Sequence, residues 1–263
     1  VSQKASLVAR SKPPPARMPV LLGFHAVRAR LKAAPQTLKE VLYVADRRDA
    51  RLKELLESLG QAGVAARAVD PGRLDQEAQG ERHQGILARA EALDQPADLE
   101  SLLEQLQPRK TPPLLVLLDG VTDPHNLGAV LRAADGAGVS AVIAPKDRSA
   151  PLSDVARRVS AGASEGLPYI QVTNLTRAIE RLQDEGYRVL GLAGEAQDSI
   201  YQADLQGPLA LALGAEGEGL RRLVREHCDG LIRLPLLGQV ESLNVSVACA
   251  VACYEAVRQR ARF

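Results

Sequence analysis

Three turns of this 263-residue chain carry the polar residues best suited to chemistry. They are Asn126 and Arg132 in DGVTDPHNLGAVLRAADGAGV (119–139), Glu216 in LALALGAEGEGL (209–220), and Ser242 and Asn244 in LPLLGQVESLNVSVA (234–248). Each turn lies at the end of a short apolar run, which is typical of the turn after a buried strand. Amide, hydroxyl, carboxylate and guanidinium groups gathered in one place could orient a polar substrate and stabilise developing charge.

The second turn disfavours ligands that carry phosphate. It is not a dinucleotide-binding G-x-G-x-x-G sequence, because Gly217 and Gly219 are followed by Arg222 where a third glycine should stand. Glu216 and Glu218 lie inside the loop, and their carboxylates would repel the phosphates of NAD or ATP. A positively charged nucleoside without phosphate fits better, and S-adenosylmethionine is such a ligand.

Each of these residues also has an ordinary structural interpretation. Ser242 and Asn244 are typical N-caps of the Ala- and Val-rich helix that follows, and Asn126 could cap the helix that carries Arg132. Arg132 could equally be a solvated residue on the face of that helix. His125 is a weaker candidate than its neighbour Asn126, and we expect it to be dispensable.

The hydrophobic pattern predicts an α/β fold made of two units. Strands at 40–45, 64–70 and 84–90, with helices at 25–34 and 48–63, predict a small first domain over residues 19–90. Residues 91–112 hold a short amphipathic helix between prolines and are interpreted as a linker.

The second predicted unit, residues 113–263, alternates short apolar runs with helical stretches. Its strands are expected at 114–119, 140–144, 168–172, 188–193, 209–214 and 230–235. Helical stretches of about 10 to 15 residues between strands predict crossover connections and a mostly parallel sheet. Ligands of such sheets bind beyond the carboxyl ends of the strands, which is where the three turns lie.

Composition excludes several classes of protein. The chain is 46% hydrophobic and 25% charged, and no apolar run approaches the roughly 18 residues of a membrane span. Its three cysteines are too few and too unevenly spaced for a disulfide framework or a zinc site, so we expect a reducing compartment, the cytoplasm, and no metal. Cys249 and Cys253, four residues apart in a helical stretch, are expected to be buried apolar residues.

The amino-terminal end is strongly basic. From Val1 to Lys39 there are eight Lys or Arg residues and no acidic residue. Residues 1–18 contain consecutive prolines and are interpreted as a disordered leader. The natural start could be Met18, or the leader could be a transit segment that directs import into mitochondria.

Taken together, the three turns closely resemble the signature motifs of the SpoU (TrmH) family of RNA ribose 2′-O-methyltransferases. The segments GFHAV (23–27), HQGILA (83–88), PKDRSA (145–150), TNL (173–175) and REHCD (225–229) extend the resemblance, and they are similar to the members that methylate guanosine in 23S rRNA. The resemblance implies a SPOUT-like catalytic domain with a carboxyl-terminal deep trefoil knot. It also implies a homodimer with active sites near the subunit interface, and an amino-terminal domain, similar to a ribosomal protein, that binds RNA.

The resemblance assigns roles to particular residues. It implies that S-adenosylmethionine is bound by Gly194, Gly214, Leu234 and Leu243, and that the catalytic set is Asn126, Arg132, Glu216, Ser242 and Asn244. A guanidinium is almost never deprotonated in proteins, so we expect Arg132 to act as an electrostatic and phosphate-anchoring group.

The expected partner is 23S rRNA or the pre-ribosomal large subunit, with no membrane partner. Candidate RNA-binding residues are Arg28, Arg30, Lys32, Arg47, Arg48, Lys146, Arg148 and Arg157. Two alternatives stay open. The substrate could be a tRNA, or the protein could be a non-catalytic RNA-binding factor in ribosome assembly.

Overall fold

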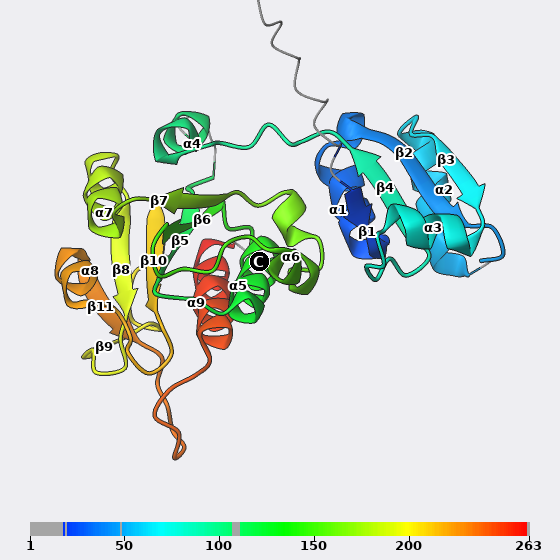
Figure 1. Cartoon of the computed structure of the whole chain (residues 1–263). Helices are drawn as coiled ribbons and strands as arrows, with labels where there is room; N and C mark the ends of the chain where they lie inside the picture. Colours follow the sequence, from blue (N-terminus) through cyan, green and yellow to red (C-terminus); the bar gives the residue numbers. More distant parts are fainter. Residues whose placement is uncertain (1–17, 19, 48, 107–110, 262–263) are drawn as a thin grey trace, which may run out of the picture.

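Two β-sheets organise the chain in the computed structural model, which describes residues 18, 20–47, 49–106 and 111–261 (Figure 1). The smaller sheet has the strand order β1-β4-β2-β3. Its strands are β1 (Val20–Leu22), β2 (Leu38–Val44), β3 (Ala66–Val69) and β4 (Ile86–Ala90). β4 is antiparallel to both β1 and β2, whereas β2 and β3 are parallel.

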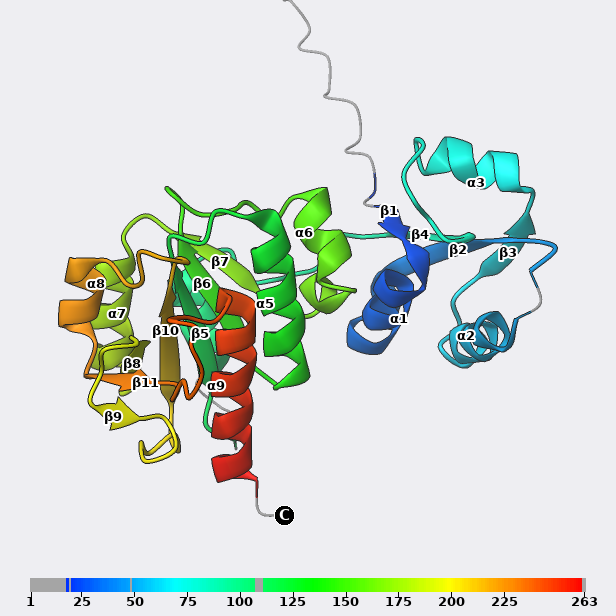
Figure 2. The same cartoon turned by 90° about the horizontal axis from the view of Figure 1, so that it is seen from below.

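Helices cover both faces of this small sheet. α1 (Gly23–Ala33) and α2 (Ala50–Gln61) lie on one face and α3 (Pro71–Glu77) on the other (Figure 2). The first face has its own apolar core, which includes Phe24, Val27 and Leu59. β1 and α3 were not predicted, although the Asp-Pro pair that starts α3 is a recognisable signal, since Asp70 accepts a hydrogen bond from the N–H of Arg73 at 3.1 Å.

The larger sheet has seven strands in the order β7-β6-β5-β10-β8-β11-β9. They are β5 (Leu114–Asp119), β6 (Ala141–Pro145), β7 (Tyr169–Val172), β8 (Arg188–Leu192), β9 (Asp198–Ser199), β10 (Leu209–Gly214) and β11 (Gly230–Arg233). Every pair of these strands is parallel, which confirms the predicted parallel sheet. The two-residue strand β9 was not predicted.

Helices also cover both faces of the large sheet (Figures 1 and 2). α5 (Pro124–Gly136), α6 (Asp154–Val159) and α9 (Val245–Arg260) lie on one side, and α4 (Leu99–Leu106), α7 (Leu175–Asp184) and α8 (Arg222–His227) on the other. β5 is therefore buried along its whole length. Its Val116 and Leu118 pack in the core of the α5 and α9 side, and Leu115 and Leu117 in the opposite core. This burial on both faces explains why the sequence of the strand is almost entirely apolar.

α4 corrects the predicted linker. Its four buried leucines pack with Ile179 and Leu182 of α7, and Arg181 of α7 binds Glu100 of α4 at 3.0 Å. The connection between the sheets is therefore shorter than residues 91–112, because α4 belongs to the core of the larger sheet. An amphipathic helix between prolines does not reveal by its sequence alone which surface covers its apolar face.

Other features of the described residues bear on the predictions. Cys249 and Cys253 are fully buried in α9, as predicted. None of the described helices has the length and apolarity that crossing a bilayer requires. The trefoil knot stays a prediction, and the leader, residues 1–18, lies outside the described residues except for Met18.

Candidate active site

The first and third turns meet at the amino-terminal ends of α5 and α9. Asn126 lies in the first turn of α5, whose N-cap Asp123 accepts a hydrogen bond from the N–H of His125 at 2.9 Å. Asn244 is the N-cap of α9 and accepts a hydrogen bond from the N–H of Ser246, also at 2.9 Å. The two residues are in contact, since Nδ2 of Asn244 donates to Oδ1 of Asn126 at 3.0 Å.

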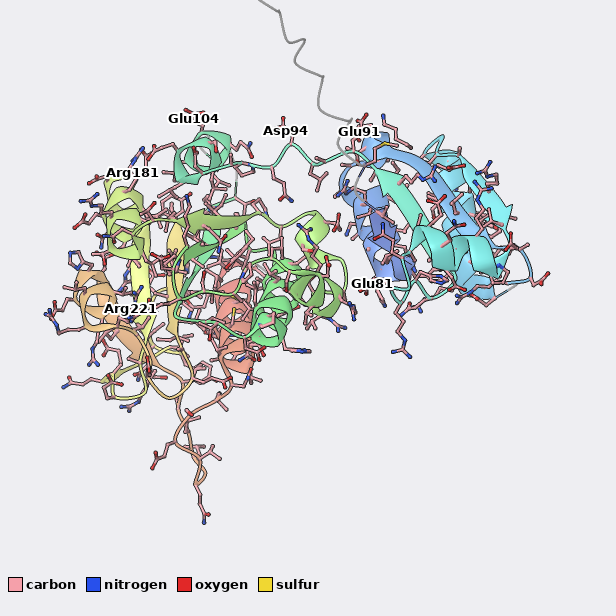
Figure 3. All side chains as sticks on the ribbon, in the orientation of Figure 1. Glu81, Glu91, Asp94, Glu104, Arg181 and Arg221 are labelled. Carbon is pink, nitrogen blue, oxygen red and sulfur yellow. The ribbon has the colours of Figure 1, made fainter. Side chains whose placement is uncertain are left out.

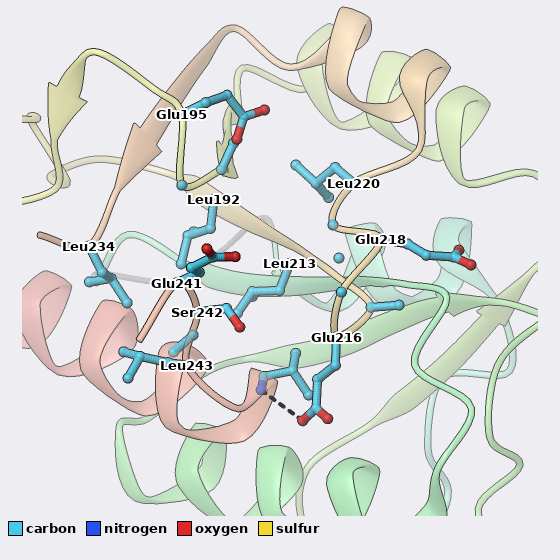
Figure 4. Close-up of a pocket in the computed structure, with 18 of the residues that line it drawn as sticks. Leu192, Glu195, Leu213, Glu216, Glu218, Leu220, Leu234, Glu241, Ser242 and Leu243 are labelled. Atoms are coloured by element: carbon cyan, nitrogen blue, oxygen red, sulfur yellow. Dashed lines mark hydrogen bonds between the residues drawn. The ribbon is translucent and has the colours of Figure 1, made fainter. Parts of the chain in front are cut away.

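The carboxylate of Glu216 completes this group from the second turn. Its Oε1 accepts a hydrogen bond from Nδ2 of Asn126 at 3.2 Å and another from Nδ2 of Asn244. The N–H of Val245, in the first turn of α9, donates to the same oxygen at 3.4 Å (Figure 4). The amino ends of α5 and α9 carry partial positive charges, which attract an acidic side chain to this position. Three segments far apart in sequence thus form one polar cluster, Asn126–Glu216–Asn244.

The second turn is a tight loop that requires glycine. A Cβ atom on Gly214 would lie 1.9 Å from the backbone carbon of Gly219, so no side chain fits there. Gly217 and Gly219 have φ values of 81° and 67°, in the left-handed region that glycine adopts without strain. The N–H of Gly219 donates to the carbonyl of Ala215 at 2.9 Å and closes the loop.

An ion pair anchors the far end of this loop, and sequence reasoning missed it. Asp119, at the end of β5, is 1% exposed, and its carboxylate accepts hydrogen bonds from the backbone N–H (2.8 Å) and Nε (2.6 Å) of Arg221. The pair joins the end of β5 to the far end of the loop that follows β10. Asp119 stands directly before Gly120 at the end of an apolar strand, which is the signal that could have marked it.

A cavity of about 400 Å³ opens at the carboxyl ends of β8, β10 and β11. This volume lies within the range of small-molecule sites. All four predicted cofactor-binding residues line the cavity, and so do Glu216 and Ser242 of the predicted catalytic set (Figure 4). The four are Gly194, Gly214, Leu234 and Leu243.

The cavity combines apolar walls with acidic groups. Leu192, Leu213, Leu234 and Leu243 supply apolar surface, and the carboxylates come from Glu195, Glu216, Glu218 and Glu241. Figure 4 shows Glu195 and Glu216 at opposite ends of the cavity. Arg225 also lines it and forms an ion pair with Glu195. The excess of carboxylates suits a ligand that carries positive charge and would repel phosphate.

Arg132 lies outside this cavity. It is exposed on α5 and makes no hydrogen bond or ion pair with any residue that the structure describes. His125 is exposed as well, and its backbone, rather than its ring, takes part in the cap of α5. The structure therefore brings Asn126, Glu216 and Asn244 together, places Ser242 in the adjoining cavity, and leaves Arg132 free on the surface.

The predicted RNA-binding residues have different surroundings. Arg28 pairs with Glu54 at 2.8 Å, and Arg47 pairs with Asp49 while its guanidinium stacks 4.4 Å from the centre of the Phe24 ring. The exposed members of the set are Arg28, Lys32, Lys146, Arg148 and Arg157, and Arg157 also pairs with Glu165 at 3.8 Å. Arg48 lies outside the described residues.

Arg30 corrects the predicted RNA-binding set. It is 4% exposed, and its Nη2 donates to Oε2 of the equally buried Glu165 at 2.5 Å. A guanidinium enclosed in this way is unavailable to an RNA phosphate. Its basic sequence neighbours gave no sign that this one side chain of α1 points toward the rest of the protein.

Metal binding has no structural support among the described residues. They contain no group of three or more His, Cys, Asp or Glu side chains that could hold an ion.

Similarity to known proteins now decides the family. The model of the "SpoU rRNA Methylase family" matches residues 113–254, more than half of the chain, and that of "RNA 2'-O ribose methyltransferase substrate binding" matches residues 20–96. The chain belongs to the SpoU rRNA methylase family. The two matched ranges correspond to the seven-stranded and four-stranded sheets.

Individual SpoU relatives cover almost the whole chain. The 23S rRNA (guanosine-2'-O-)-methyltransferase RlmB of Ralstonia nicotianae is 52% identical over 241 residues, which are 92% of this chain and 96% of that protein. A crystal structure of an RNA 2'-O ribose methyltransferase is 26% identical and superposes with a TM-score of 0.70 over 93% of this chain and 89% of its own. AviRb of Streptomyces viridochromogenes, solved with AdoMet, has a TM-score of 0.68 at 24% identity, covers 93% and 91%, and supports the fold.

Proposed function

We propose that this protein transfers a methyl group from S-adenosylmethionine to the ribose 2′-oxygen of a guanosine in 23S rRNA. The observation that carries the proposal is the convergence of the three turns. The Asn126–Glu216–Asn244 cluster adjoins an acidic cavity lined by Gly194, Gly214, Leu234 and Leu243. The relative from Ralstonia nicotianae, whose name states this reaction, is 52% identical over 92% of the chain.

The cavity residues fit S-adenosylmethionine by their chemistry. Glu218 and Glu241 provide negative charge for a cationic ligand, and the leucine side chains provide an apolar wall for its adenine. Gly194 allows the ligand to approach the backbone closely, because a Cβ atom there would meet no other atom within 4 Å. When bound, S-adenosylmethionine supplies a methyl group that its sulfonium charge has already activated.

The polar cluster would hold the ribose hydroxyl. A ribose 2′-hydroxyl is a poor nucleophile until its proton is removed or its developing negative charge is stabilised. Asn126 and Asn244 present amide groups beside the cavity, and Glu216 fixes both of them through hydrogen bonds. In this proposal Arg132 anchors a phosphate of the RNA and stabilises negative charge near the hydroxyl.

The proposal includes a homodimer with active sites near the subunit interface. Two observations support it. Large apolar side chains are exposed near the site, including Leu237 (99%) and Val240 (62%) on the loop before α9, and Val247 (47%) on α9 itself. Arg132 does not line the cavity of its own chain. Sedimentation velocity that gives a monomer at micromolar concentration would contradict the dimer.

The domain boundaries, the trefoil knot and the cytoplasmic location complete the proposal. Residues 19–90 would bind RNA and residues 113–263, with α4 added, would form the catalytic domain. The three cysteines are free thiols, which favours a reducing compartment. The RNA substrate could be free 23S rRNA or the pre-ribosomal large subunit.

One assay tests the reaction against both alternatives. The pure protein is incubated with S-adenosylmethionine labelled in its methyl group and with 23S rRNA or bulk tRNA, and the modified nucleotide is then mapped. Label at a guanosine ribose of 23S rRNA supports the proposal. Label only in tRNA would move the substrate to the tRNA class. No label in either RNA, with RNA binding retained, would favour a non-catalytic assembly factor.

Salt dependence tests the RNA contacts. Lys32, Lys146, Arg148 and Arg157 are exposed, and cations that bind phosphates make affinity fall steeply as salt rises. RNA affinity that does not change with salt would remove these residues from the interface.

A further inference from the structure

The buried ion pair between Arg30 and Glu165 joins the two halves of the chain. Arg30 belongs to α1 beside the small sheet, and Glu165 to a short 3-10 helix, η2 (Ala163–Glu165), in the half that contains the large sheet. Each residue is 4% exposed. Nη1 of Arg30 also donates to the carbonyl of Glu91 at 2.7 Å, at the start of the connection between the sheets. A charge that is buried this deeply is costly unless it is paired. Removing either partner would therefore leave the other charge buried at this contact without compensation.

Small residues allow the two halves to approach closely around this pair. Ala29 and Ala33, with the backbone of His25, recur every four residues and therefore form one stripe along α1. A Cβ atom on Gly162 would lie 2.6 Å from the carbonyl oxygen of His25 and 2.9 Å from Cβ of Ala29, so a side chain there would clash. A Cβ atom on Gly166 would lie 3.6 Å from Cβ of Ala33, which is an ordinary contact. The stripe of α1 thus rests on the backbone around η2.

Charged contacts surround this interface. Nη2 of Arg158, on α6, binds Oε2 of Glu81 at 2.8 Å. Figure 3 shows Glu81 on the edge of the amino-terminal half that faces α6. Both side chains of this pair are about half exposed, so it contributes less to docking than the buried pair.

The docked surface leads directly to the active site. α6 packs against α5 so closely that a Cβ atom on Gly128 would lie 2.6 Å from both the carbonyl oxygen of Ala156 and Cβ of Val159. Gly128 is two residues beyond Asn126 on the same helix. α1 is therefore connected through η2, α6 and α5 to the polar cluster by tightly packed elements that leave no room for sliding.

We propose that Arg30 and Glu165 are positioning residues, which dock the amino-terminal domain on the catalytic domain so that RNA held by the first is aligned with Asn126 in the second. This inference rests on the proposed function for its substrate. In the docked state the two domains form one RNA-binding surface of fixed geometry. RNA bound by one domain then meets the other at a high effective concentration.

A disulfide across the interface tests whether the docked state exists and is active. The 3.6 Å separation at positions 33 and 166 lies within the usual Cβ–Cβ range of disulfides, and both positions are exposed to an oxidant. We expect the Ala33→Cys/Gly166→Cys variant to form an intramolecular disulfide under mild oxidation. The oxidised form should keep kcat/KM for 23S rRNA within about twofold of its reduced form, because the docked geometry is already the productive one. The Ala33→Cys and Gly166→Cys single variants are the controls for oxidation.

A substitution tests the positioning role. Glu165→Ala leaves the Arg30 guanidinium buried without its partner and should release the amino-terminal domain. KM for 23S rRNA should then rise by about tenfold or more, because RNA bound by one domain no longer meets the other at a high effective concentration. The values of kcat at saturating RNA and of the affinity for S-adenosylmethionine should stay within about twofold of wild type. Arg181→Gln, which removes the ion pairs with Glu100 and Glu185 inside the catalytic half, is the control and should change neither constant.

Three results would overturn the inference: no disulfide in the double variant, a reversible loss of activity on oxidation, or an unchanged KM in Glu165→Ala. Failure of the proposed function gives a different result. A wild-type protein that methylates no 23S rRNA would refute the reaction, whereas disulfide formation would still report whether the domains dock.

Discussion

Nδ2 of Asn244 lies 3.0 Å from Oδ1 of Asn126, although 118 residues separate the two in the chain. Each sits at the amino end of a different helix, and the carboxylate of Glu216 binds both amides. The contact links two helix starts with the loop after β10. The amides are held in place before any substrate arrives, which lowers the cost of orienting a bound hydroxyl.

Replacing Asn244 should separate its structural role from its chemical role. Asn244→Ala removes the N-cap of α9 and should cost about 1 kcal/mol of stability. It also removes the amide that binds Asn126 and Glu216, so methyl transfer should fall by about 100-fold or more. Urea unfolding and single-turnover methylation measure the two effects.

Asn174 provides the matched control for this substitution. It is the N-cap of α7, accepts a hydrogen bond from the N–H of Arg177 at 3.2 Å, and does not line the cavity. Asn174→Ala should therefore lose a similar stability, about 1 kcal/mol, with unchanged turnover. Equal losses of activity in the two variants would mean that Asn244 acts only as a cap.

Arg132→Ala should remove activity without removing the cofactor. The side chain is exposed and has no partner in the described part of the chain, so stability should change by no more than about 0.5 kcal/mol. Methylation should fall by about 100-fold or more, because a cation aimed at developing charge is lost. Calorimetry should give an unchanged Kd for S-adenosylmethionine, since Arg132 is absent from the cavity wall.

Arg177→Ala serves as the control for Arg132, since it removes an arginine from α7 on the opposite side of the sheet. Turnover by Arg132→Ala within a few-fold of this control would exclude Arg132 from the mechanism.

The partly buried thiol of Cys228 predicts how stability depends on pH. Burial, assisted by the charges of Asp229 and Asp119, raises the pKa of Cys228 to about 12, whereas an unfolded thiol titrates near its ordinary value of 9.0. The neutral thiol therefore contributes stability that is present below pH 9 and is lost as pH rises toward 12. Between about pH 8 and 10.5 the wild type should lose on the order of 1 kcal/mol more than Cys228→Ala, after allowing for partial exposure. If urea unfolding gives the two proteins the same loss of unfolding free energy between these pH values, the raised pKa of Cys228 is contradicted.

Much of the fold was predictable because burial on two faces leaves a clear local pattern. The predicted bounds of β5 and β10, residues 114–119 and 209–214, are those of the structure. Asn126, Glu216 and Asn244 were identified because their turns resemble family motifs and because parallel strands bring their carboxyl ends to one edge.

The missed features depend on contacts between distant segments. Arg30 has the same basic neighbours as Arg28, yet only Arg30 meets the acidic residue of another domain. α4 has an apolar face whose partner, α7, begins 69 residues after α4 ends. Local sequence shows that such groups need a partner, and the tertiary fold determines which partner they find.

The ion pair of Asp119 and Arg221 predicts that substituting either residue with alanine lowers the free energy of unfolding by a different amount. The side chain of Asp119 is fully buried, whereas that of Arg221 is 43% exposed. Asp119→Ala leaves a guanidinium that water can solvate, and should cost about 1–3 kcal/mol. Arg221→Ala leaves a buried carboxylate with the backbone N–H of residue 221 as its remaining partner, and should cost more, about 3–5 kcal/mol.

Both variants should weaken binding of S-adenosylmethionine by about tenfold, because either one frees the end of the loop that carries Glu216 and Gly219. Arg222→Ala, which removes only the exposed pair with Glu226, should cost no more than about 0.5 kcal/mol and leave binding unchanged. Equal stability losses for Asp119→Ala and Arg221→Ala, measured by urea unfolding, would show that the carboxylate is not the costly member of the pair.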